Sequence, residues 1–99
     1  MTEFLPSEFY LAQNYPNPFR RKTVIKYCVP YRSKVQITVF SNEGKELEKL
    51  VDEEKNPGTY EVEFTNVETG HAPSLQRHTF TYRLEAGDYR SEKEMEIEK

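Results

Sequence analysis

Hydrophobic and polar residues alternate along most of this chain, which is the period expected of half-buried β-strands. Residues 23–30, TVIKYCVP, place Ile25, Tyr27 and Val29 on one face. Similar runs are KVQITVF, KELEKLV, TYEVEF, HTFTYRL and YRSEKEMEIEK, at residues 34–40, 45–51, 59–64, 78–84 and 89–99. A further short strand is expected within residues 8–11. The pattern predicts a β-protein with no helix of useful length.

Turn residues separate these runs. Ser41-Asn42-Glu43-Gly44 predicts a hairpin with a positive φ at the glycine. Asn56-Pro57-Gly58 is typical of a type II turn. Residues 85–88, EAGD, predict another turn, and the polar residues 65–77 predict a loop.

The run at residues 45–51 departs from strict alternation. Leu47, Leu50 and Val51 cannot all lie on one face of a regular strand. A β-bulge or a short helical turn would account for the spacing.

Antiparallel strands with one apolar face each must pack as two sheets or close into a barrel. We expect an all-β, Ig-like antiparallel sandwich of about seven strands, without the Cys…Trp…Cys pattern of antibody domains. Residues 11–99 form this domain, and residues 1–10 are a lead-in or linker. The expected core consists of Tyr27, Val29, Val35, Ile37, Val39, Tyr60, Val62, Phe64, Phe80, Tyr82 and Leu84.

Residues 11–19, LAQNYPNPF, combine prolines, asparagines and aromatics immediately before the first long strand. Proline fixes its own φ and favours extended geometry in the residue before it. The segment is therefore expected to be a stiff polyproline-like rod, with Tyr15 and Phe19 anchoring it against the end of the sandwich. Such a rod would cover a sheet edge at the entrance to the domain.

Composition excludes several classes of protein. The net charge of −3 over 99 residues, with scattered basic residues, argues against nucleic-acid binding. No segment is long and apolar enough to span or insert into a membrane, and the N-terminus does not resemble a signal peptide. The lone Cys28 cannot form an intrachain disulfide.

Candidate chemistry is sparse. His71, His78 and Cys28 lack the further ligands that a zinc site needs. Cys28 would be a nucleophile only if a histidine lowered its pKa, and a surface-facing position is the simpler interpretation. The alternating glutamates are typical of a solvated strand face. We expect no catalytic residue, metal or cofactor, and no enzyme activity.

The ordered motifs LAQNYPNPF, NPGTYEVEF and TYRLEAGDYRSEKEMEIEK resemble the C-terminal sorting domain of the type IX (Por) secretion system. A related Ig-like domain occurs in the flagellar hook-capping protein. The resemblance spans residues 11–99 and rests on the motifs in combination.

The resemblance implies that a larger protein is exported through the periplasm to the outer membrane, cell surface or medium. Its partners would be the secretion translocon, the sorting machinery and a covalently attached upstream cargo domain. The sorting signal maps onto Gly87, Lys93, Met95, Ile97 and Lys99. The domain-start motif maps onto Asn14, Tyr15, Pro16, Asn17, Pro18 and Phe19.

Two departures from the family pattern keep an alternative open. The loop at residues 65–77 is long, and Glu94, Glu96 and Glu98 replace the usual apolar or basic residues of the last strand. These features fit an Ig-like structural or protein-binding module without a secretion role. A homodimer also stays open, since an exposed first or last strand can pair with a copy of itself.

Overall fold

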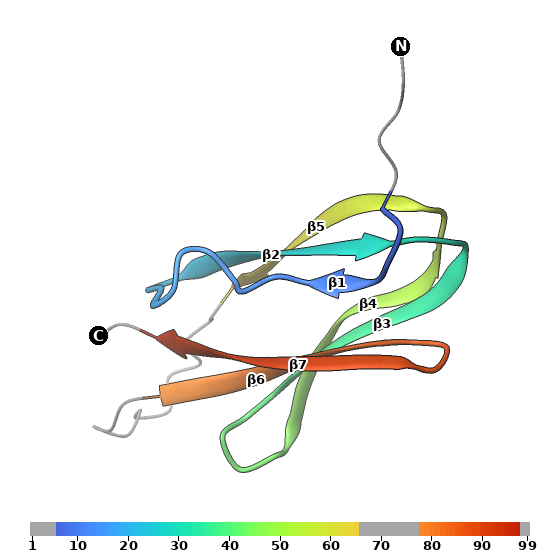
Figure 1. Ribbon diagram of the computed structural model, residues 1–99. Coiled ribbons are helices and arrows are strands. Elements are labelled where there is room, and N and C mark those ends of the chain that lie inside the picture. The colour runs from blue at the N-terminus through green and yellow to red at the C-terminus, as the bar shows by residue number, and fades with distance from the viewer. Residues whose placement is uncertain (1–5, 66–77, 98–99) are drawn as a thin grey trace.

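The computed structural model describes residues 6–65 and 78–97, and within them the chain forms an all-β sandwich (Figure 1). This confirms the predicted fold. Its seven strands are β1 (Tyr10–Leu11), β2 (Lys22–Val29), β3 (Ser33–Phe40), β4 (Glu46–Lys55), β5 (Gly58–Thr65), β6 (His78–Ala86) and β7 (Tyr89–Ile97).

The strands form two antiparallel sheets. One has the order β1-β2-β5 and the other the order β4-β3-β6-β7. The β3–β4 and β6–β7 hairpins stay within the larger sheet, whereas the chain crosses between sheets after β2, after β4 and after β5. Each sheet must bury one apolar face, so the two pack face to face in an Ig-like arrangement.

The core lies between the inner faces of the two sheets. Eight residues of the expected core are buried: Tyr27, Val29, Val35, Ile37, Val39, Phe64, Tyr82 and Leu84. Tyr60, Val62 and Phe80 pack against this core but are only half-buried. Tyr60 and Val62 lie on β5, an outer strand of the smaller sheet, where fewer neighbours cover a side chain. The core also includes residues that we did not predict: Leu11, Phe19, Ile25, Val51, Ala86 and Met95.

The two hairpin turns have the geometry that their glycines predict. Gly44 has a φ of 88°, and its N–H donates to the Ser41 carbonyl at 2.9 Å. Gly87 has a φ of 60°, and Asp88 is not among the described residues with positive φ, as expected of a type II′ turn. Both positive-φ positions therefore select glycine.

The type II turn predicted at Asn56-Pro57-Gly58 is wrong. Gly58 has a φ of 156°, whereas that turn needs about +80° at this position. Gly58 instead begins β5 and pairs with Val29, so the segment is a crossing between sheets and not a tight hairpin turn.

The irregular spacing in β4 comes from β-bulges. The β3–β4 register shifts between Ile37 and Thr38 and again between Val39 and Phe40. Leu50 and Leu47 have no Cα partner on β3 at these two shifts. The bulge interpretation is confirmed, and the helical-turn alternative is not, because β4 continues through both positions.

The polyproline-like rod is also wrong. The chain bends at residues 16–18, between its two sheet contacts, instead of running straight as a polyproline rod does. Tyr15 bridges Val24 of β2 in antiparallel fashion, and Phe19 bridges Ile97 of β7 in parallel. The segment thus passes from the edge of one sheet to the edge of the other. Figure 1 shows it at the end of the sandwich where β7 finishes.

Some sequence expectations concern residues that the structure does not describe, and they have no outcome. The loop beyond Thr65 at residues 66–77 lies outside them, as do Lys99 and His71. The start of the lead-in, residues 1–5, lies outside them as well.

Candidate functional site

The last strand carries most of the predicted sorting residues, and their side chains face the interior of the sandwich. Met95 is 0% exposed and pairs with Phe80 of β6. Lys93 pairs with the buried Tyr82, so it lies on the same inner face and is half-buried. Ile97 packs against the core. In the folded domain, these residues are structural.

Gly87 lies apart from the other sorting residues. It occupies the β6–β7 turn and is exposed, ten positions before Ile97 along an extended strand. At about 3.3 Å per residue, the two are about 30 Å apart. The structure therefore brings Lys93, Met95 and Ile97 together on one face but does not join Gly87 to them.

Residues 13–19 form a segment that we call the strap. It contains a buried asparagine with several hydrogen-bond partners. Asn14 is 2% exposed. Its backbone N–H donates to Tyr82 Oη at 2.8 Å, and its Nδ2 donates to Thr23 Oγ1 at 2.9 Å and to the Pro16 carbonyl at 3.1 Å. Gln13 Nε2 donates to Asn14 Oδ1 at 2.8 Å. A buried amide needs such partners, so they fix the strap's path.

The two aromatic residues of the strap have opposite environments. Phe19 is 1% exposed, and its ring meets that of Phe64 edge-on at 6.1 Å. Tyr15 is 79% exposed, so the prediction that it anchors the segment is wrong. Its antiparallel pairing with Val24 directs its backbone, and not its side chain, toward the protein.

The strap covers the outer backbone edge of β7. The Glu96 N–H donates to Asn17 Oδ1 at 2.9 Å, and the Glu96 carbonyl accepts from the Phe19 N–H at 3.0 Å. Gln13 Nε2 also donates to the Glu94 carbonyl at 2.6 Å. The expectation that this segment covers a sheet edge is confirmed.

Burial affects the ionisation of Tyr82, which forms hydrogen bonds to the strap and to the residue before it. Tyr82 is fully buried, and its hydroxyl donates to the Ala12 carbonyl at 2.7 Å while accepting from Asn14. Desolvation raises the pKa of Tyr82 to about 12, against a smaller lowering by the Asn14 N–H. The hydroxyl therefore stays protonated and holds both partners across the physiological range.

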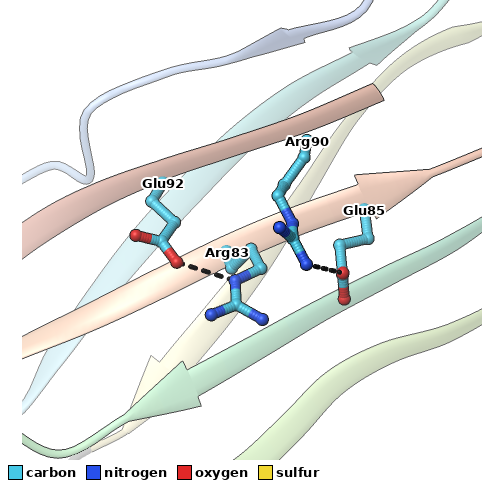
Figure 2. A network of polar contacts seen from close by, with 4 residues as sticks. All are labelled: Arg83, Glu85, Arg90 and Glu92. Carbon is cyan, nitrogen blue, oxygen red and sulfur yellow. Dashed lines mark hydrogen bonds and ion pairs between the residues drawn. The ribbon is translucent and has the colours of Figure 1, made fainter. Parts of the chain in front are cut away.

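The outward face of the β6–β7 hairpin is charged. Arg83 and Glu92 lie directly opposite one another and approach to 2.7 Å, and Arg90 and Glu85 form a second pair at 3.2 Å (Figure 2). Exposed pairs of this kind contribute about 0.2–1 kcal/mol each. They match the predicted solvated face.

Cys28 is half-buried on the outward side of β2. Its sulfur lies 3.6 Å from Thr59 Oγ1. Among the residues that the structure describes, no group of three or more His, Cys, Asp or Glu side chains is placed to hold a metal ion. The side chain of His78 is not described.

Two surface features were not predicted. An aromatic cluster joins the half-buried Phe9 to the half-buried Tyr89 by stacking at 5.0 Å and to the exposed Tyr31 edge-on at 5.4 Å. An open hollow beside the strap is lined by Ala12, Gln13, Tyr15, Val24, Lys26 and Glu61. Both depend on residues distant in sequence, so the linear pattern gave no signal for either.

The comparisons with known proteins identify no relative of this chain. No family model matches the chain, and neither a curated protein nor a solved structure matches it. Residues 6–65 and 78–97 contain no helix that is long and apolar enough to cross a membrane.

Proposed function

We propose that this chain is a non-catalytic sorting domain that directs a larger exported protein through the type IX system to the cell surface. The proposal rests on the motif resemblance. The observation that supports it best is the contact between the strap and β7, through Asn17 and Phe19 on one side and Glu96 on the other.

That contact joins the two segments to which the resemblance assigns functions. The domain-start motif would mark the boundary with the upstream cargo, and the last strand would carry the signal. A signal strand held in a folded sandwich needs a partner along its free edge, because unpaired backbone groups at an edge invite pairing with other chains. The strap supplies that partner.

The test is export of a reporter. Residues 1–99 are fused to the C-terminus of a secreted reporter enzyme with its own export signal, in a bacterium that carries a type IX system. We expect the reporter at the cell surface or in the medium, with a fusion that ends at residue 88 retained in the periplasm. Retention of the complete fusion in the periplasm would contradict the proposal.

The native protein offers an independent check. An immunoblot of cell fractions should show a band far larger than 11.7 kDa in the envelope or periplasm. A cytoplasmic band near that mass would reduce the secretion proposal to a likeness of fold.

A second candidate is an Ig-like protein-binding module. The aromatic cluster favours it, since Tyr31 is 64% exposed beside the half-buried Phe9 and Tyr89. Aromatic side chains at a surface are enriched in protein interfaces. Under this alternative, the reporter fusion stays in the periplasm, and Tyr31→Ala weakens capture of a partner while leaving the melting temperature unchanged.

A further inference from the structure

The three described signal residues of β7 lie on its inner face, which the folded domain largely covers. Lys93, Met95 and Ile97 face the interior, and Met95 has no exposed surface. A receptor reaching the outer face of β7 meets the carboxylates of Glu92, Glu94 and Glu96 instead. Of the three signal side chains, Met95 is therefore closed to a receptor on the intact sandwich, and Lys93 and Ile97 are only partly exposed.

The backbone of β7 is covered as well at its C-terminal end. One edge of β7 pairs with β6 along its length. At the other edge, the strap occupies the Glu94 carbonyl and both backbone groups of Glu96. An extended peptide from a receptor cannot add along this end of β7, because those donors and acceptors are already used.

We infer that the form of this domain recognised by its receptor is one in which β7 has separated from the sandwich, and that the strap controls how often this occurs. The inference rests on the proposed function and concerns the regulation of the same signal. Local opening of an edge strand is less costly than global unfolding, because only that strand's contacts are lost.

The position of β7 makes local release feasible. It is the outermost strand of the larger sheet, with β6 as its one neighbouring strand in the described order. Release keeps β3, β4 and β6 paired and exposes the inner side chains of β7 as an extended peptide. The strap opposes release through Asn17, whose side chain bonds β7 but contributes nothing to the buried core.

The first test measures release in the purified protein. In a Cys28→Ser background, Met95→Cys places a buried thiol on β7, and Ile37→Cys places one on the inner strand β3. Addition of Asn17→Ala should speed thiol labelling at position 95 several-fold and leave position 37 unchanged. Tyr15→Ala, at an exposed strap residue, is the matched control and should change neither rate.

Equal acceleration at positions 95 and 37 would mean global unfolding and would overturn the inference. An unchanged rate at position 95 would overturn the controlling role of the strap.

The second test locks the strand in place. Thr81 and Glu94 are cross-strand partners on the outer face of β6 and β7, and their Cα positions suit a disulfide. In the reporter fusion with Cys28→Ser, we expect Thr81→Cys/Glu94→Cys to reduce export at least tenfold once oxidised. Each single-cysteine variant should be exported like the parent, and a reductant should restore export of the pair.

The outcomes separate the two proposals. Export of the parent fusion together with export of the intact disulfide form would overturn strand release and leave the sorting function standing. Retention of the parent fusion itself would overturn the sorting function, and the inference with it.

Discussion

Tyr82 shows how one buried polar group can connect distant parts of the chain. Its hydroxyl donates to the Ala12 carbonyl and accepts from the Asn14 N–H, so a side chain on β6 orders the segment before the strap. Removal of the oxygen leaves a buried donor and acceptor without partners, and such groups are costly.

Tyr82→Phe should lower the free energy of unfolding by about 1–3 kcal/mol. Tyr60→Phe is the matched control, because its hydroxyl donates to the Asn56 carbonyl at an exposed site where water can replace it. Urea denaturation of both variants at neutral pH measures the difference. Equal stabilities would show that the Tyr82 hydroxyl bonds are unimportant.

The raised pKa of Tyr82 also predicts a loss of stability in alkali. The pKa is about 12 in the folded state against 10.0 for an ordinary tyrosine, so folding favours the protonated form. The stabilisation of the folded state by protonated Tyr82 is complete below pH 10 and disappears as the pH rises to 12. The free energy of unfolding falls by about 2–3 kcal/mol over this range. Unfolding curves between pH 9 and about 11.5 should fall more steeply for the parent than for Tyr82→Phe.

Substitutions at Gly44 measure the free-energy cost of a positive φ without the effect of a steric clash. A Cβ added there meets no atom within 4 Å, while its φ is 88°. Gly44→Val should therefore cost about 1–2 kcal/mol through strain, and Gly44→Asn much less, because asparagine tolerates positive φ. At about 4–8 °C per kcal/mol for a domain of this size, thermal melts resolve the two variants.

Among the elements, β4 is the least regular, and its two bulges place similar residues differently. Leu50 packs against the core, whereas Leu47 is 47% exposed. Their spacing in the sequence does not distinguish them, since both interrupt the alternation of the strand.

Leu50→Glu should destabilise the domain by about 1–2 kcal/mol, because a charge replaces apolar area packed on the core. Leu47→Glu should stay within about 0.5 kcal/mol of the parent. Melting temperatures measure both changes. A larger effect at Leu47 would mean that the bulges are assigned to the wrong residues.

At the scale of the whole molecule, the strap joins both sheets. It pairs with β2 through Tyr15 and with β7 through Phe19, and the Phe19 ring lies in the core against Phe64 of β5. The two sheets also share a continuous set of buried side chains. Unfolding of one sheet therefore exposes the other.

Phe19→Ala should cost about 3–5 kcal/mol, the range for truncation of a buried aromatic residue. Unfolding should remain a single transition, with far-ultraviolet circular dichroism and tyrosine fluorescence coinciding. Tyr15→Ala, four residues earlier in the strap, should change stability by less than about 0.5 kcal/mol. Two separated transitions in the parent would show that the sheets unfold independently.

The sequence by itself determined the strands, the hairpin glycines and most of the core. Alternation is a local property, because successive side chains of a strand point to opposite faces. Positive φ at a turn is equally local, which is why the positive φ of Gly44 and the turn at Gly87 were predicted correctly. The inward face of β7 was also implied by the alternation of Met95 and Ile97 with glutamates.

The tertiary structure alone decided which sheet edges the strap covers. Its prolines set local geometry, but its partners lie on β2, β6 and β7, and the bond from Glu96 to Asn17 spans 79 positions. No local pattern specifies which edge a segment covers, because pairing depends on which strands packing leaves exposed. For the same reason Phe19 entered the core and Tyr15 faced solvent, although the sequence presented them as equivalent aromatic anchors.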